Sequence, residues 1–460
     1  MGLLIRVRKT WHKHMTEQVV IVLSAIVFAV AGLSARRLGA KSIIEFSTRR
    51  DSLSWFVTAA GVSMTFVGGA ALVNMSSLGY SFGWVSLVDP IAVSAGISIS
   101  AVLIGKYRSD KGVTMAELLS SDYRPLSIYI GIITSTIFLL VTSAQYVAFS
   151  KLLAPYFPRV SPIVMMLIPS VVISIYVFLG GFAAVTKTDV IQLIFVIGVL
   201  VLPVGYFAIH HASYLGHDTP MAISRSRMPI DLMLLLCISV FYVPISQDMN
   251  IRAKSAKTGG AGVIGFLCGA LFYSVIVSVC IYMGIILAKH GVNVGDSESA
   301  FTTFFKQFFP SWGVLAVLAG MAAIWSTLDT YLMNTITSFA QDVVRKSPVG
   351  IRIRDSSLIV GSGLVVFVAA MLIALYFFKV LELILTALLI YISVLIPVAF
   401  GRKMKIPDRT VLVFSLVITG MIIVCEWLKL PVNPKAIIYP LSGVGIMIVV
   451  RSVTLLRQQS

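Results

Sequence analysis

The chain is dominated by apolar stretches long enough to cross a lipid bilayer. A hydrocarbon core of about 30 Å needs about 20 helical residues. About thirteen such stretches occur: 19–35, 54–80, 83–104, 127–155, 162–182, 188–209, 229–247, 260–288, 312–342, 356–378, 380–400, 411–427 and 436–453. Each stretch is continuous rather than alternating, which predicts helices and not a β-barrel. The sequence therefore predicts an all-α polytopic membrane protein, with the lipid bilayer as its surroundings.

The polar connections are too short to form another domain. The longest are expected at 105–126, 210–228 and 289–311, and none has room for a folded catalytic unit. The sequence has no phosphate-binding loop of the Gly-x-x-x-x-Gly-Lys-Ser/Thr type and no His or Cys cluster with metal-ligand spacing. We therefore expect residues 1–460 to form a single transmembrane domain that is not an enzyme.

The net charge of +17 would suit nucleic-acid binding, but its distribution favours membrane topology. Most of the 36 lysines and arginines fall in alternate connections, with clusters at 36–50, 106–124, 345–354 and 402–409. Such connections face the cytoplasm under the positive-inside rule. We therefore expect a multi-pass plasma (inner) membrane protein with its N-terminus outside, its C-terminus in the cytoplasm and no nucleic-acid partner. The basic residues at 6–13 oppose this orientation but are outnumbered.

Two of the expected helices carry residues that weaken a helix near its middle. Gly68 and Gly69 interrupt the stretch 54–80, and Pro244 interrupts 229–247. Glycine lowers helix stability by about 1 kcal/mol relative to alanine, and proline removes a backbone donor. Taken singly, these residues also suit close helix packing or an ordinary kink. Taken together they indicate two repeats, at about 54–210 and 229–400, each beginning with a broken helix as in many transporters.

Three motifs resemble those of the sodium/solute symporter family. They are GGFAAVTKTDVIQ (180–192), GMAAIWSTLDTYLMNTITSFAQDVV (320–344) and YVPISQDMNIRAKSAK (242–257). The resemblance implies a leucine-transporter-like fold, a 5+5 inverted repeat with one leading and two trailing helices. It also implies sodium-coupled symport of a small polar organic solute, of the amino acid, carboxylate or sugar class, by alternating access.

The second motif places two adjacent hydroxyls, Ser326 and Thr327, near the centre of an expected span. A hard cation prefers oxygen ligands, and such hydroxyls could hold Na⁺ together with a carbonyl one turn earlier, at Ala323. The resemblance implies a sodium site completed by the carbonyls of Met64 and Val67 beside the Gly68 break. The alternative is that both hydroxyls bond back to carbonyls of their own helix.

The first motif is expected to form a short cytoplasmic turn between two spans. Asp189 would then begin the second span as a helix N-cap. The resemblance implies a cation relay, with Asp189 near the two hydroxyls as a further sodium ligand, and one residue can serve both as cap and as relay. Sugar transporters of the family usually carry Trp at the position of Lys187, and we expect this lysine to extend to the membrane surface.

Candidate solute-binding residues lie beside the two breaks and on neighbouring spans. They are Phe66, Gly68, Gly69, Asp89, Ser143, Gln145, Ser239, Phe241, Tyr242 and Gln247. Phe66 stands where proline transporters carry an aspartate, which argues against proline as the solute. Asp89 is either the N-cap of a helix that begins at Pro90 or a counter-charge for an amino-bearing solute. Asp329 and Glu382 are weaker candidates.

Two other functions stay open at this point. The chain could be a proton-coupled or uncoupled solute carrier. Phe66 and Lys187 keep this alternative open, because both depart from the residues that relatives of the family carry at these positions. It could also be a transporter-like membrane sensor, although no kinase sequence follows Ser460. The intact pair of Ser326 and Thr327 favours Na⁺ as the coupling ion. The solute and the oligomeric state are not determined by these patterns.

Overall fold

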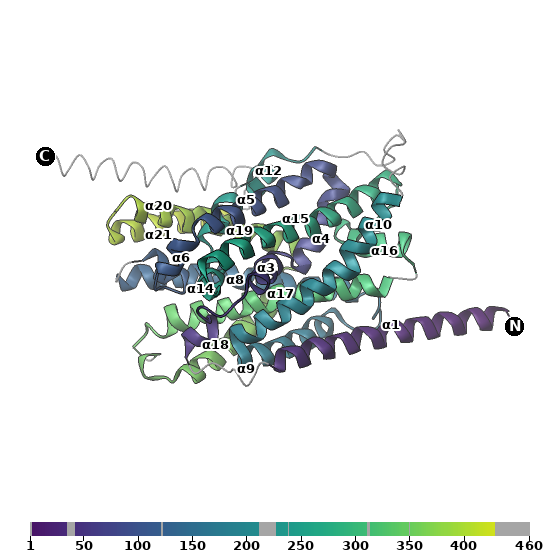
Figure 1. Ribbon diagram of the computed structural model, residues 1–460, viewed down its shortest axis with the longest axis horizontal. Helices are drawn as coiled ribbons and strands as arrows, with labels where there is room; N and C mark the ends of the chain where they lie inside the picture. Colours follow the sequence, from purple (N-terminus) through teal and green to yellow (C-terminus); the bar gives the residue numbers. More distant parts are fainter. Residues whose placement is uncertain are drawn as a thin grey trace.

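A computed structural model describes residues 2–34, 42–120, 123–210, 227–237, 239–310, 313–348 and 350–427. Over these residues the chain forms helices joined by short turns, and most of the helices run along the long axis of the molecule (Figure 1). Seven helical runs in the described part are long and apolar enough to cross a membrane. The expected count of thirteen spans is not confirmed, and the last of them, 436–453, lies outside the described residues.

The described residues of the first half of the chain form ten α-helices. They are α1 (Gly2–Leu33), α2 (Ile43–Ser47), α3 (Trp55–Phe66), α4 (Gly69–Phe82), α5 (Val88–Val102), α6 (Ile104–Ser109), α7 (Met115–Leu119), α8 (Arg124–Leu153), α9 (Pro162–Val196) and α10 (Leu202–His210). A 3₁₀ turn, η2 (Gly83–Leu87), precedes α5, and a π-helical turn, η3 (Ile197–Val201), joins α9 to α10.

The second half contains a similar set. Its α-helices are α12 (Ile230–Cys237), α13 (Ser239–Tyr242), α14 (Gln247–Ser255), α15 (Gly259–Lys289), α16 (Ala300–Phe308), α17 (Gly313–Ser338), α18 (Asp355–Tyr376), α19 (Val380–Ile390), α20 (Ile396–Lys403) and α21 (Asp408–Trp427). Short 3₁₀ or π turns connect them: η4 (Val243–Ile245), η5 (Ser297–Ser299), η6 (Phe339–Val344), η7 (Gly350–Arg352) and η8 (Tyr391–Leu395).

A single glycine turns the chain within α9. Gly181 has φ +50° and ψ −141°, a conformation that side chains rarely adopt. Tyr176 and Thr188, on either side of it, both donate to the same carboxylate oxygen of Asp329. In a straight helix these two residues would be about 18 Å apart along the axis, so the two arms must bend sharply at Gly181. The expected turn is therefore present but is confined to this residue, and the polar residues after it are helical.

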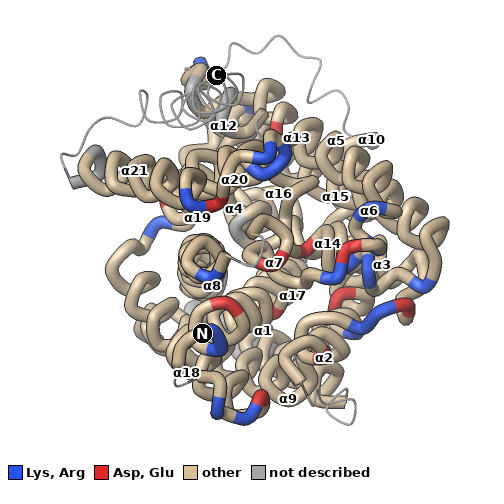
Figure 2. The backbone as a smooth tube through the Cα atoms, turned by 90° about the vertical axis from the view of Figure 1, so that its left-hand side faces the viewer, with Lys and Arg blue, Asp and Glu red and all other residues tan. Residues whose placement is uncertain are grey.

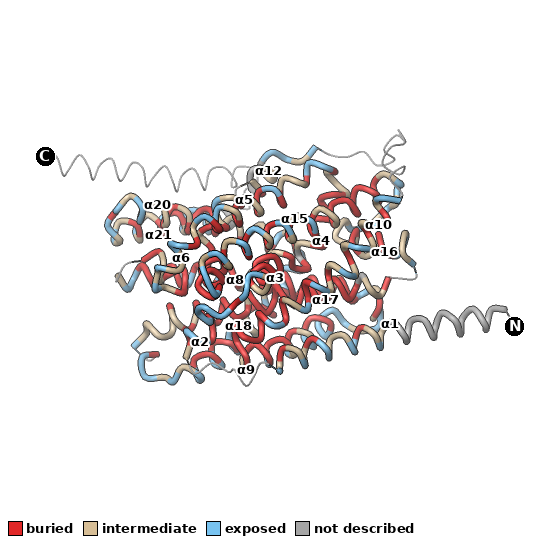
Figure 3. Tube along the Cα trace, viewed as in Figure 1, coloured by how far each residue is buried: buried red, intermediate tan, exposed pale blue. Residues whose placement is uncertain are grey.

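Helix α17 runs through the interior and packs against α8 and α9, while α15 packs against α3, α4 and α5. Buried residues concentrate along these inner helices, and exposed ones lie on the outer faces (Figure 3). Helix α1 lies on the outside of the bundle along α9 (Figure 1). The functional candidates on α3 and α17 consequently lie in the centre of the molecule.

Two glycines allow α4 and α15 to approach closely. A Cβ atom on Gly79 would clash with the backbone carbonyl of Ile281, and one on Gly284 would clash with that of Ser76. Small residues at helix contacts of this kind are typical of membrane bundles, because they let backbones come together. The pair therefore fixes the distance between two inner helices.

Replacing Gly79 with alanine is expected to destabilise the protein by about 1–3 kcal/mol, because the backbone of α15 must move to admit the methyl group. Thermal unfolding in detergent measures the effect. Gly361→Ala is the matched control, since nothing lies within 4 Å of a Cβ atom there. Equal unfolding temperatures for the two variants would contradict the close approach.

The basic connections expected on one side of the membrane meet at one end of the bundle. Arg124 donates to the carbonyl of Lys346, and Arg402 donates to the carbonyls of Leu118 and Ser120. Figure 2 views this end and shows Lys and Arg around its rim. These connections therefore share one side of the molecule, as their charge predicts.

Candidate functional site

The first helix break occurs where the glycine pair predicts it. Helix α3 ends at Phe66, Val67 and Gly68 are non-helical, and α4 begins at Gly69. A Cβ atom on Gly68 would lie 2.7 Å from the hydroxyl oxygen of Thr327, and one on Gly69 would clash with Ile324. The glycines thus serve both purposes that the sequence suggests, because they break the helix and let α17 pack against the break.

The second break lies at the predicted proline. Helix α13 ends at Tyr242, the turn containing Pro244 follows, and Ser246 is extended. The hydroxyl of Ser246 accepts a hydrogen bond from the backbone N–H of Met249 and so caps α14. Backbone N–H and C=O groups at the facing ends of α13 and α14 are therefore free of the hydrogen bonds that one continuous helix would form, and they can contact other groups inside the bundle.

The residues predicted to bind sodium gather at the first break. Met64, Val67, Ala323, Ser326 and Thr327 are all buried. The Thr327 hydroxyl donates to the Met64 carbonyl across 3.1 Å, and the Ser326 hydroxyl donates to Asp189. The alternative in which both hydroxyls bond back to their own helix is therefore wrong, because each reaches a different helix.

Asp189 lies in the interior of the protein and not at a helix end. It follows Gly181 within the second arm of α9 and has no exposed surface. One carboxylate oxygen accepts from Ser326, and the other lies 3.1 Å from the guanidinium of Arg252. The capping role predicted for Asp189 is wrong, because helical residues precede and follow it. Lys187 is exposed and donates to the Ser34 hydroxyl, so it points away from this carboxylate, as expected.

Arg252 reaches Asp189 from α14 along the surface of α3. Its guanidinium also donates to the hydroxyls of Thr65 and Thr330, and it passes over Gly61, where a Cβ atom would clash with it. Side-chain exposure is 2% for the arginine and 0% for Asp189. The two form a fully buried ion pair, for which desolvation is costly unless hydrogen bonds satisfy the charges.

A second buried carboxylate, Asp329, lies one turn along α17 from Ser326. One of its oxygens accepts from Tyr176 and Thr188, at 2.6 and 3.0 Å, and the other has no hydrogen-bond partner. Both polar side-chain atoms of the buried Gln192 also lack a partner. The region around Asp189 therefore retains unused oxygens, which suits passage of a cation. Glu382 has no such role, since it is exposed and lies 3.8 Å from Lys379.

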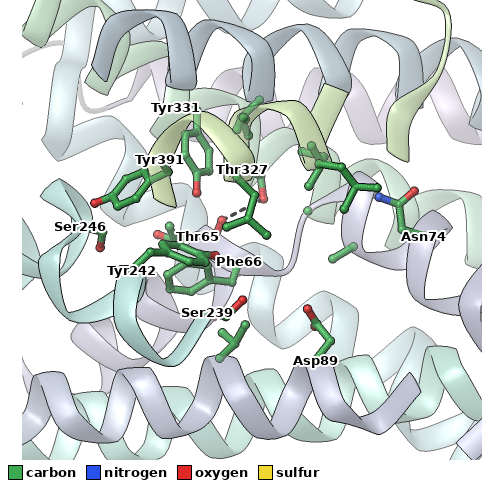
Figure 4. A pocket seen from close by; sticks show the side chains of 18 of the residues that line it. Thr65, Phe66, Asn74, Asp89, Ser239, Tyr242, Ser246, Thr327, Tyr331 and Tyr391 are labelled. Atoms are coloured by element: carbon green, nitrogen blue, oxygen red, sulfur yellow. Dashed lines mark hydrogen bonds between the residues drawn. The ribbon is translucent and has the colours of Figure 1, made fainter. Parts of the chain in front are cut away.

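A cavity of about 150 Å³ lies beside the first break. Six of the predicted solute-binding residues line it: Phe66, Gly68, Asp89, Gln145, Ser239 and Tyr242. Thr327 also lines the cavity, so its hydroxyl is shared between the predicted ion site and the cavity wall (Figure 4). The structure thus places the predicted ion ligands and most of the predicted solute residues next to each other.

The four other predicted solute residues lie elsewhere. Gly69 packs on Ile324, and the Ser143 hydroxyl bonds back to the Leu139 carbonyl. Phe241 is 64% exposed, on the outer face of α13. The Gln247 carbonyl oxygen accepts from the backbone of Met115 and the hydroxyl of Ser338, so this side chain ties α14 to α7 and α17.

Asp89 is not a helix cap. Helix α5 begins at Val88 and is preceded by the turn η2, so Asp89 lies inside its first turn and makes no capping bond. Its carboxylate instead accepts from the hydroxyl of Tyr273, at 2.8 Å. The 3₁₀ turn η2 leads directly into α5, so the helical path begins before Asp89.

Many further lining residues were not identified from the sequence, among them Asn74, Asp248, Tyr273, Tyr331 and Tyr391. Asn74 and Asp248 carry a signal that could have found them, since each is a polar residue next to a helix break. The three tyrosines carry none, because their distance from the breaks along the chain gives no indication that they meet.

Comparisons with known proteins show the family to which the chain belongs. The model of the sodium:solute symporter family matches residues 46–402. The chain is 23% identical over 396 residues to the sodium/pantothenate symporter of Haemophilus influenzae, covering 80% of this chain and 76% of that one. It is 26% identical over 312 residues to the sodium/glucose cotransporter of Vibrio parahaemolyticus, covering 65% and 53%, respectively.

Solved structures show the same fold. A sodium-coupled sialic acid symporter, in a substrate-bound outward-open state, aligns with a TM-score of 0.68 and 15% identity over 95% of this chain and 98% of that one. A nucleobase–cation symporter in a closed conformation aligns with a TM-score of 0.58 and 15% identity over 88% and 93%. The chain therefore belongs to the sodium:solute symporter family and is a sodium-coupled transporter with the leucine-transporter fold, not an enzyme.

Proposed function

We propose that the coupling sodium ion binds between the end of α3 and the middle of α17. Its ligands are the carbonyls of Met64, Val67 and Ala323 and the hydroxyls of Ser326 and Thr327. The observation that carries the proposal is the 3.1 Å contact between the Thr327 hydroxyl and the Met64 carbonyl, two oxygens brought together at a helix break. Unwound backbone and hydroxyls of this kind coordinate sodium in transporters built on broken helices.

The position of Thr327 supports a coupling mechanism. This residue belongs to the proposed ion site and also lines the cavity next to Gly68. A sodium ion at this point would join the end of α3 to α17 and so order the broken segment that forms one cavity wall. Each ligand then favours the conformation that binds the other, and the coupling free energy is the same in both directions.

We assign Asp189 the role of a relay on the cytoplasmic path of the ion. Its carboxylate accepts from Ser326, one of the proposed ligands, and a sodium ion that leaves the site can move towards it. Arg252 is then the built-in cation that neutralises Asp189 when no sodium is present. Asp189 is thereby a sodium ligand during release.

The solute occupies the cavity, in contact with Phe66, Gly68, Asp89, Gln145, Ser239 and Tyr242. The volume of the cavity is similar to that of an engineered cavity of about 150 Å³ that accepts benzene. We therefore propose a small solute. One sodium ion crossing 100 mV supplies about 2.3 kcal/mol, and a tenfold gradient adds about 1.4 kcal/mol. Together these could concentrate such a solute several-hundred-fold.

Uptake by proteoliposomes tests the proposal. An inward sodium gradient should drive accumulation of one of four radiolabelled solutes: an anion (pantothenate), a zwitterion (proline), an uncharged sugar (glucose) or a cation (choline). The same gradient made with potassium should drive none. Equal uptake under the two gradients would reject sodium at the proposed site as the coupling ion.

The orientation in the membrane is also a proposal, with the N-terminus outside and the C-terminus in the cytoplasm. The common end formed by Arg124, Lys346 and Arg402 supports it, because basic connections face the cytoplasm. We also propose two repeats, at about 54–210 and 229–400, and the broken helix near the start of each supports them.

Reporter fusions are expected to give a cytoplasmic signal after Arg124, Arg354 and Arg409, and an external signal near Gly295. The reason is that the first three positions belong to the basic end and Gly295 does not. A phosphatase and a fluorescent-protein reporter at each position provide opposite readouts. A cytoplasmic result at Gly295 would overturn both the orientation and the repeat boundaries.

A further inference from the structure

We infer that the solute of this cavity is an organic cation, a small molecule with an ammonium group and a compact apolar body; the inference rests on the proposed solute site. Two carboxylates, Asp89 and Asp248, line the cavity, and no Lys, Arg or His is among the residues that line it in the described part of the chain. The wall therefore carries negative charge and offers no side-chain counter-charge to an anion.

Neither carboxylate makes a direct ion pair with a basic side chain in the described part of the chain, although Arg252 attracts Asp248 from beyond contact distance. Asp89 accepts from the Tyr273 hydroxyl and Asp248 from the amide of Asn334, and both residues are more than nine-tenths buried. Among the described residues, no Lys, Arg or His nitrogen lies within 4 Å of either carboxylate. Arg252, one turn from Asp248, is held by Asp189 instead. Carboxylates buried at membrane depth are costly unless they are paired, and a cationic solute would pair them.

Aromatic rings form much of the remaining wall. The rings of Tyr242 and Tyr391 lie 5.3 Å apart, and those of Phe66 and Tyr273 lie 6.0 Å apart. Figure 4 shows Tyr242 and Phe66 on one side of the cavity, with Tyr331 opposite and Asp89 below, pointing inward. Ring faces attract a cation through their quadrupole, and aromatic cages recognise quaternary ammonium groups. The same rings accommodate an apolar body.

An unpartnered acceptor provides a separate indication. The side-chain oxygen of Asn74 has no hydrogen-bond partner, although this residue is 3% exposed and lines the cavity. Buried polar atoms are normally satisfied, so a bound solute is expected to donate to this oxygen. A hydroxyl or an N–H group on an organic cation can do so, whereas a carboxylate cannot.

The wild-type protein in sodium buffer provides a test that needs no mutation. Binding of choline should be at least tenfold tighter than binding of 3,3-dimethylbutan-1-ol, which has the same shape without the charge. It should also be at least tenfold tighter than binding of pantothenate or proline. Titration calorimetry on the purified protein measures all four, with tetramethylammonium and ethanolamine as further cationic probes.

The variants Asp89→Asn and Asp248→Asn should each weaken choline binding at least tenfold. Asparagine retains an acceptor for Tyr273 in the first and for Asn334 in the second, so only the charge is lost. Glu382→Gln is the control, because this carboxylate is exposed and away from the cavity. Unchanged choline affinity in both cavity variants would overturn the inference.

Thermal unfolding with and without sodium separates the two proposals. Suppose that sodium raises the unfolding temperature but choline, tetramethylammonium and ethanolamine all fail to bind, or that pantothenate or proline binds more tightly than choline. The inference of a cationic solute is then overturned, while the sodium site stands. If sodium has no effect on unfolding, the proposed sodium site itself fails.

Discussion

Replacing Thr327 with alanine is expected to reduce sodium affinity at least tenfold and to lower sodium-driven uptake to the level of the potassium control. The change removes one proposed ligand, and it also removes the contact between α17 and the Met64 carbonyl at the helix break. Radioactive sodium binding to the purified protein measures the affinity. Uptake by proteoliposomes measures the consequence for transport.

Two companion variants make the Thr327 result specific. Thr327→Ser keeps the hydroxyl and should retain most of the sodium affinity. Thr337→Ala removes a buried hydroxyl from the same helix, but that hydroxyl only bonds back to the Met333 carbonyl, so sodium binding should not change. Similar sodium affinities for Thr327→Ala and Thr337→Ala would contradict the proposed site.

Replacing Arg252 with methionine is expected to cost about 3–5 kcal/mol of stability, which is typical when one partner of a buried ion pair is removed. Methionine fills much of the volume but leaves Asp189 without its guanidinium, while the carboxylates of Asp189 and Asp329 repel each other. Thermal unfolding in detergent measures the loss. Lys379→Met is the control, because its ion pair with Glu382 is exposed and such pairs contribute about 0–1 kcal/mol.

Adding Asp189→Asn to Arg252→Met should restore more than half of the lost stability, since the unpaired carboxylate is then neutral. The double variant should still release sodium more slowly than the wild-type protein, because the relay carboxylate is absent. Sodium efflux from loaded proteoliposomes measures that rate. An additive loss of stability in the double variant would exclude the ion pair, and wild-type efflux would exclude the relay.

The positions of the helix breaks could be predicted from the sequence because their causes are local. Gly68, Gly69 and Pro244 weaken a helix through their own backbone chemistry, whatever packs around them. The motif containing Ser326 and Thr327 likewise indicated the proposed ion ligands, of which the structure brings Thr327 into contact with Met64. The expected span count was less secure, because a turn at a single glycine such as Gly181 leaves almost no polar connection in the sequence.

The residues of the cavity could be predicted only in part. Tyr242 lines it, whereas its neighbour Phe241 is exposed, because consecutive helical side chains point about 100° apart and the sequence does not give the rotation of the helix. Gln247 lies beside the same break but contacts α7 and α17 instead. Three tyrosines reach the cavity from other elements: Tyr273 from α15, Tyr331 from α17 and Tyr391 from the turn η8.

The sequence by itself determined the class of the protein and its broken helices, and it indicated the residues that we propose as ion ligands. In a bilayer the backbone must satisfy its own hydrogen bonds, so apolar length alone predicts helices, and helix-breaking residues act where they stand. Only the tertiary structure decided that Asp189 meets Arg252 and that Asp89 faces a cavity with aromatic walls. Those pairings depend on how helices that are distant in the chain are rotated and how closely they approach each other. Side-chain packing determines both.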